Sequence, residues 1–371
     1  MPMRAMDSAC AGAISPTMKL DLHRHLEGSH SPAALVDVCR RYGVTDPLFF
    51  DATTGAPRAV DDVARTLVME GPSDDASLFY RCITRARVAY VSEEAIGALA
   101  RIAYDEAAAD TDGFEMRVSL FSMTRTLLDN EGTAWRALSP TAFADRAERV
   151  LAVVLDARDR ARDDVKRAGR DVPMLVRLGF SRTFESETHT RALADMARAH
   201  AARLTGLDVL GIVTGDDKEP LPDALRDILL SLRQDLPDLT IHAGEFEGPE
   251  SVARMLSLSP QGIGHGVHSV ASDDVMARLA KDGVTLEVCP TSNRLLIPTA
   301  LSALTARHAG AAPLVTLQRA HVHCVLGSDD PTPMGTSFTD EWRVAEELGV
   351  DMARLSADIA RRYRQITSPG A

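Results

Sequence analysis

The chain has 371 residues, of which 45% are hydrophobic and 25% are charged, so it is long and apolar enough to bury a large core. Its formal net charge of −12 argues against a nucleic-acid partner, because an acidic surface repels phosphate backbones. No stretch reaches about 18 consecutive apolar residues, so we expect no membrane span. The five cysteines form no Cys-x-x-Cys pair, which argues against a disulfide framework and is typical of a cytoplasmic protein.

Short apolar runs alternate with longer amphipathic stretches along most of the chain. Residues 1–18 precede them and mix small, polar and Met residues, so we expect a disordered tail, followed by a single domain over 19–366. The runs are rich in Val, Ile and Leu and cover 19–26, 113–119, 172–180, 208–215, 239–245, 262–268, 284–290 and 321–329. Eight such runs separated by helical patterns predict the α/β class and a (β/α)8 TIM barrel.

Helical periodicity is clearest over 139–168, 188–204 and 221–232. The stretch 31–112 is too long for one crossover helix, so we predict a helical insertion between the first and second strands. This insertion is either a structural decoration or a lid that shields a small substrate from water. The sequence leaves these two interpretations open.

Metal-ligating residues stand at the ends of three predicted strands. His23 and His25 are two apart, so strand alternation places both side chains on one face. His242 and Asp329 follow two further apolar runs, and the carboxyl ends of barrel strands meet at one face. Three imidazoles and one carboxylate suit zinc, which leaves a position for water in catalytic sites and lowers the pKa of that water to roughly 7.

Three more polar residues lie beside these predicted ligands. Glu245 follows His242 by three residues, and an intervening glycine permits a sharp turn that brings a carboxyl near the metal as a general acid or base. His265, between two glycines, can orient water, and Asp330 can hydrogen-bond a substrate. Singly, they are ordinary as a loop carboxylate, a core histidine and a turn residue. Their joint position at strand ends favours an active site.

The end of the predicted fourth strand bears on the number of metals. Some barrel hydrolases hold two metal ions bridged by a carbamylated Lys at this strand. Here the strand ends in Thr214-Gly215-Asp216-Asp217, and Lys218 lies beyond it. We therefore predict a single metal ion.

Taken together, the motifs resemble the adenosine deaminase family of the amidohydrolase superfamily, in the order of that family, from about Lys19 to Trp342. The central matches are His23-x-His25-Leu26-Glu27-Gly28, His242-Ala243-Gly244-Glu245, Gly264-His265-Gly266 and Ser328-Asp329-Asp330-Pro331. Further matches are Glu115-Met116-Arg117-Val118-Ser119, Ser181-Arg182-Thr183-Phe184, Gly215-Asp216 and Cys289-Pro290-Thr291-Ser292-Asn293.

The resemblance implies a role for each matching residue. One Zn2+ would be bound by His23, His25, His242 and Asp329. Glu245 would protonate purine N1, His265 would position the attacking water, and Asp330 would hydrogen-bond N7. The backbone N–H of Gly215 would reach N3, and the substrate would also contact His25 and Glu27.

The substrate expected from this resemblance is a 6-aminopurine nucleoside, with adenosine converted to inosine and ammonia. Glu27 departs from the family pattern, since many adenosine-specific members carry Asp there and adenine-specific relatives often carry Glu. Adenine is therefore one alternative, and a modified adenosine, such as an aminodeoxyfutalosine-like or antibiotic-pathway nucleoside, is another. AMP is disfavoured because no Lys and Arg cluster follows the predicted strands. A purine-binding protein without catalysis is disfavoured because the chain has all four candidate metal-ligating residues and Glu245. The sequence specifies no oligomeric state.

Overall fold

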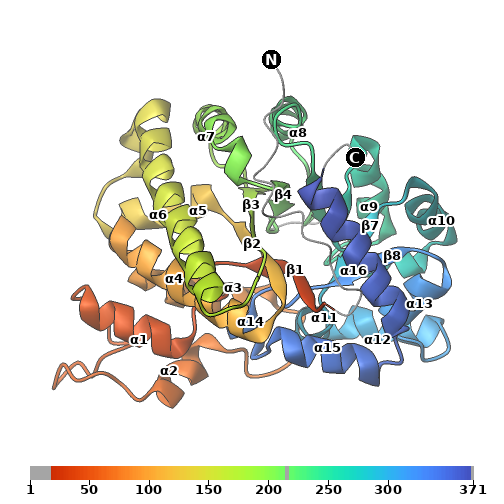
Figure 1. Ribbon diagram of the computed structural model, residues 1–371, viewed down its shortest axis with the longest axis horizontal. Coiled ribbons are helices and arrows are strands. Elements are labelled where there is room, and N and C mark those ends of the chain that lie inside the picture. Colours follow the sequence, from red (N-terminus) through yellow and green to blue (C-terminus); the bar gives the residue numbers. More distant parts are fainter. Residues whose placement is uncertain (1–17, 214–216, 369–371) are drawn as a thin grey trace.

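The computed structural model describes residues 18–213 and 217–368, and at its centre is one sheet of eight parallel strands in the order β1 to β8. The strands are β1 (Leu20–His25), β2 (Gly113–Val118), β3 (Met174–Ser181), β4 (Gly206–Leu210), β5 (Leu239–Ala243), β6 (Gly262–His265), β7 (Thr285–Val288) and β8 (His323–Leu326). A parallel bridge between Arg24 and Asp329 brings the first strand against the chain that follows the last. The predicted (β/α)8 barrel is confirmed, and Figure 1 shows its helices around the strands.

The strands are buried on both faces, which explains why the sequence shows nearly continuous apolar runs instead of strict alternation. Their carboxyl ends are less well predicted than their centres. The run 208–215 was wrong at its end, because β4 stops at Leu210 and Gly211 adopts a φ of 81°. The run 262–268 was also too long, because His265 and Gly266 turn the chain with φ values of 58° and 66°.

Four helices and a short 3-10 helix form the insertion between β1 and β2. They are α1 (Pro32–Arg41), α2 (Val60–Leu67), α3 (Ala76–Ala86), η2 (Arg87–Ala89) and α4 (Glu93–Asp110). In Figure 1, α1 and α2 lie at the outer edge of the molecule, in red and orange. Phe79, Tyr80 and Ile83 of α3 line a pocket at the carboxyl ends of the strands. The helical insertion is confirmed, and its function as a lid stays a prediction.

The remaining helices follow the strands β2 to β8. They are α5 (Leu120–Asn130), α6 (Pro140–Arg167), α7 (Glu187–Ala199), α8 (Asp223–Leu232), α9 (Pro249–Met255), α10 (Asp273–Asp282), α11 (Pro290–Leu296), α12 (Pro298–Arg307), α13 (Pro313–Arg319), α14 (Pro331–Met334), α15 (Phe338–Glu347) and α16 (Met352–Thr367), with the short 3-10 helices η3 (Trp135–Ala137), η4 (Ala201–Arg203), η5 (Leu256–Leu258) and η6 (Val267–Ala271). The predicted helix 139–168 matches α6, whose first turn is capped by the Ser139 hydroxyl accepting from Ala142 N at 3.1 Å. The predicted helix 188–204 divides into α7 and η4.

Charged side chains from β2, β3, α16 and the residue before β5 form a buried network, which the sequence analysis did not anticipate. Arg177 of β3 donates to Glu115 at 2.9 Å and to Asp238 at 2.6 Å. Arg362 of α16 donates to both oxygens of Asp238, at 2.6 and 2.8 Å, and none of these residues is more than 2% exposed. Because each buried charge faces an opposite one, this network ties the carboxyl-terminal helix to the barrel.

Three further sequence expectations concern the cysteines, the amino-terminal tail and membrane-spanning helices. Cys39, Cys82, Cys289 and Cys324 are buried free thiols, while Cys10 lies outside the described residues. The predicted tail 1–18 also lies outside them, apart from its last residue. Among the helices within 18–213 and 217–368, none combines the length and apolarity needed to cross a bilayer.

Candidate active site

The structure brings the four predicted metal ligands together at the carboxyl end of the barrel. Nε2 of His23 lies 3.1 Å from Nε2 of His242 and 3.3 Å from Nε2 of His25. Oδ1 of Asp329 lies 3.3 Å from Nε2 of His25 and 3.7 Å from Nε2 of His23. These separations match the edge of about 3.4 Å of a tetrahedron with zinc–ligand bonds of about 2.0–2.2 Å. The donor atoms therefore fit one zinc ion.

Two carboxylates behind the cluster orient the histidine rings. Nδ1 of His23 lies 3.0 Å from Oε2 of Glu287 on β7, and Nδ1 of His242 lies 3.1 Å from Oδ1 of Asp208 on β4. When each Nδ1–H donates to its carboxylate, the Nε2 lone pair is directed into the cluster. Burial lowers the pKa of His23 well below its usual value and that of His25 to about 3. Both rings are therefore neutral, which is the form that binds a metal.

Glu245 lies beside the ligand cluster without belonging to it. Its Oε2 is 3.6 Å from Nε2 of His265, and the side chain is buried on the loop after β5. Burial, followed by the negative charge of Asp329, raises the pKa of Glu245 well above its usual value. This favours the protonated carboxyl, so Glu245 has the properties of a proton donor.

His265 is held at the end of β6 by a residue that the sequence analysis mentioned only within a motif. The Asn293 side-chain amide lies 3.1 Å from His265 Nδ1, so with the amide as donor the neutral ring carries its proton on Nε2. Burial lowers the pKa of His265 to about 4. Nε2 faces Glu245 and lies 3.9 Å from Oδ2 of Asp329. The ring is thus fixed between the ligand cluster and the candidate acid.

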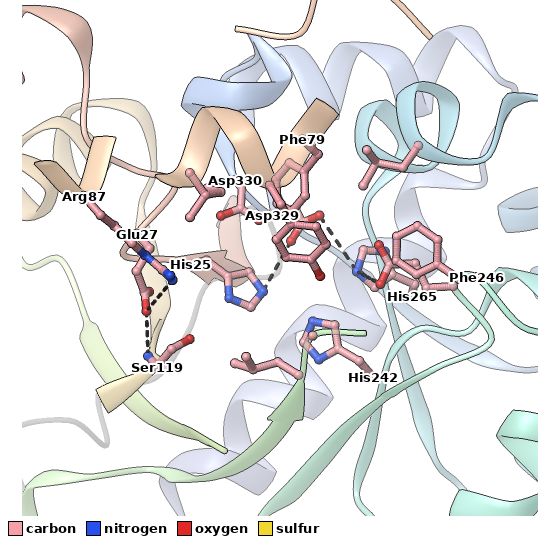
Figure 2. A pocket seen from close by; sticks show the side chains of 16 residues that line it. His25, Glu27, Phe79, Arg87, Ser119, His242, Phe246, His265, Asp329 and Asp330 are labelled. Atoms are coloured by element: carbon pink, nitrogen blue, oxygen red, sulfur yellow. Dashed lines mark hydrogen bonds and ion pairs between the residues drawn. The ribbon is translucent and has the colours of Figure 1, made fainter. Parts of the chain in front are cut away.

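A pocket opens from this cluster toward the helical insertion, as Figure 2 shows. Glu27 lies at one end, where its Oε1 accepts from Ser119 N at 3.0 Å and lies 3.8 Å from Nη2 of Arg87. Its other oxygen, Oε2, is buried without a hydrogen-bond partner among the described residues. Asp330 also lines the pocket, and burial together with the charge of Asp329 raises its pKa well above the usual value. The pocket therefore has an acidic, hydrogen-bonding wall.

Gly215, the expected N3 contact, lies outside the described residues. Among the described residues, Gly211 lines the pocket directly after β4. The sequence analysis also missed Arg87, Asp208, Glu287 and Glu219 as site residues. Asp208 and Glu287 did carry a signal, because Asp208 begins an apolar run and Glu287 interrupts another. Arg87 and Glu219 carried none, because the short helix η2 that begins at Arg87 and the loop after β4 that carries Glu219 are positioned only in the folded barrel.

A parallel barrel whose strand ends gather three imidazoles and buried carboxyls around one point is typical of metal-dependent hydrolases. The family model described as adenosine deaminase matches residues 18–362. Similar proteins include an adenine deaminase from Chelativorans sp. (30% identity, covering 92% of this chain and 90% of that protein) and an aminodeoxyfutalosine deaminase from Acidothermus cellulolyticus (27%, 91% and 85%).

Solved structures show the same fold. An adenine deaminase from Arthrobacter aurescens superposes with a TM-score of 0.72 at 20% identity and covers 96% of this chain and 95% of its own. An amidohydrolase from Burkholderia ambifaria, with bound Zn, superposes with a TM-score of 0.63 at 16% identity and covers 99% and 90%. The chain belongs to the adenosine deaminase family, and it is a hydrolytic deaminase.

Proposed function

We propose that this protein hydrolyses the C6–N bond of a 6-aminopurine, using one zinc ion held by His23, His25, His242 and Asp329. The observation that carries the proposal is the position of the buried Glu245 carboxyl, 3.6 Å from His265 and beside a ligand cluster of zinc dimensions. Water is added at C6 and ammonia leaves, so the product is a 6-oxopurine. When bound, zinc supplies the Lewis acidity that activates water at neutral pH.

The residues around the cluster can donate the protons and orient the water that this reaction needs. Glu245 donates its proton to purine N1, which makes C6 more electrophilic. His265 orients the water that attacks C6. Asp330, whose raised pKa favours the protonated carboxyl, donates to the N7 acceptor. Side chains of α3 line the pocket, and we infer that the insertion is the lid that keeps bulk water away.

The sequence predicts adenosine as the substrate, and the geometry at Glu27 favours adenine as a second candidate. Glu27 is 3% exposed, and its Oε2 has no partner among the described residues. A buried carboxylate oxygen without a partner calls for a donor, and the free base offers N9–H where adenosine has a glycosidic bond. The 30% identical relative is also named an adenine deaminase.

Loss of ultraviolet absorbance on conversion of a 6-amino to a 6-oxo purine tests the proposal. Zinc-loaded and chelator-treated protein should be compared on adenosine, 2′-deoxyadenosine, adenine, AMP and a 5′-modified adenosine. We expect turnover of adenosine or adenine by the zinc-loaded protein, loss of turnover after chelation, and recovery when zinc is added back. Absence of turnover on all five compounds with zinc bound would refute the proposal.

A further inference from the structure

Glu219 is a buried carboxylate that the reaction outlined above does not use. It lies on the segment after β4, is 1% exposed, and accepts from three consecutive backbone N–H groups of the loop after β5. Oε2 accepts from Gly244 N at 2.7 Å, and Oε1 accepts from Glu245 N at 3.0 Å and from Phe246 N at 2.9 Å. One side chain thus satisfies the whole backbone turn that carries Glu245.

The charge of Glu219 is stabilised on the other side. Burial alone would raise its pKa, but the Arg182 guanidinium, a hydrogen bond from the Ser251 hydroxyl and the backbone donors hold the pKa below its usual value. Arg182 also donates to the backbone oxygens of Glu219 and His242. The ionised Glu219 and Arg182 therefore hold the His242–Phe246 segment from both ends.

The turn over residues 244–246 lies after the end of β5 and outside any helix or strand, so other contacts must hold its shape. Gly244 has a φ of 64°, and a Cβ on this residue would come within 2.6 Å of Val252 Cγ2. The left-handed residue directs successive N–H groups to one side, where they form a concave site for an anion. Without the Glu219 carboxylate, three buried donors would lose their acceptor.

We propose that Glu219 is a positioning residue that acts through Glu245 by fixing the turn that places this carboxyl 3.6 Å from His265. The inference rests on the proposed function, in which Glu245 is the proton donor. A positioning role differs from a general structural role in one respect. The effect of Glu219 on turnover then depends on a carboxyl being present at position 245.

A double-mutant cycle separates these two roles. Glu219→Gln places an amide NH2 where one oxygen accepts backbone N–H groups, and it should lower kcat about 10- to 100-fold, with zinc content retained and KM changed by less than about threefold. In the Glu245→Gln background, where no proton donor is left to position, the same change should lower the residual kcat by less than about twofold. An equal loss in both backgrounds, a wild-type kcat in Glu219→Gln, or loss of zinc from it would overturn the inference.

Two further variants complete the experiment. Glu219→Asp keeps an acceptor-only carboxylate, so it should recover part of the lost kcat, and it can replace the Gln variant in the cycle if that variant does not fold. Glu250→Gln makes the same chemical change at an exposed carboxylate nearby and should keep the wild-type kcat. If the wild-type protein turns over no 6-aminopurine, or if Glu245→Gln is fully active, the proposed function fails. If the wild-type protein is active, Glu245→Gln loses most activity and the cycle is additive, then only the role of Glu219 is refuted.

Discussion

Glu287 Oε2 lies 3.0 Å from Nδ1 of the candidate ligand His23, and both side chains are fully buried. The same carboxylate forms ion pairs with Arg117 of β2 and with Arg362 of α16. The orientation of one candidate zinc ligand is therefore coupled to the carboxyl-terminal helix α16 through the buried Glu287 carboxylate.

Replacing Glu287 by Gln should weaken zinc binding about 10- to 100-fold, because the amide is a poorer acceptor for the His23 Nδ1–H. It should also lower the free energy of unfolding by about 3–5 kcal/mol, because two guanidinium groups lose a buried counter-charge. Competition with a zinc chelator measures the first effect and urea unfolding the second. Glu346→Gln, at an exposed position of α15, is the matched control. An unchanged zinc dissociation constant would show that Glu287 does not orient His23.

Glu245→Gln should keep zinc and lose most activity, because the change removes a proton donor and no ligand. A general acid contributes about 10²- to 10⁴-fold to the rate, so kcat should fall by that order. Metal analysis and steady-state turnover of the same preparation provide both measurements. Near-normal turnover by a zinc-loaded variant would remove Glu245 from the proposed mechanism.

The barrel and the meeting of the four candidate ligands could be predicted from the sequence because their signals are local. Eight apolar runs define the strands, and polar residues at their ends mark the face that carries the candidate site. The carboxylates that orient the ligands could not be assigned, since His23 and Glu287 are 264 residues apart and meet only when the barrel closes. The end of β4 was misplaced because nothing in the apolar run signals that Gly211 turns the chain.

Glu27→Asp should shift the substrate preference toward adenosine. Shortening the side chain by one methylene leaves room near the ribose and moves Oε2 away from N9–H, and one methylene changes discrimination by about 10- to 200-fold. We expect the ratio of kcat/KM for adenosine to that for adenine to rise by at least about tenfold. Glu70→Asp, at an exposed position of the insertion, should leave the ratio unchanged. A constant ratio in both variants would show that Glu27 does not contact the group at N9.

Glu341 should make the stability of the protein depend on pH. This residue of α15 is 1% exposed, and burial raises its pKa to about 7, although Thr291 N and the Thr336 hydroxyl donate to it. In the unfolded chain the carboxyl has its usual pKa of 4.5. Between these two values the folded protein binds more protons than the unfolded chain, so the free energy of unfolding falls as pH rises. The contribution is about 3 kcal/mol, since each pKa unit corresponds to about 1.4 kcal/mol.

Glu341→Gln removes this titration and keeps an oxygen that can accept from one of the two donors. Urea unfolding at about pH 5 and about pH 8 should therefore show a smaller loss of stability for the variant than for the wild-type protein, by up to about 3 kcal/mol. Glu347→Gln, an exposed carboxylate at the end of the same helix, should follow the wild-type profile. Parallel profiles for the wild type and Glu341→Gln would mean that Glu341 has the same pKa in the folded and unfolded protein, and that its burial is offset by the two hydrogen bonds.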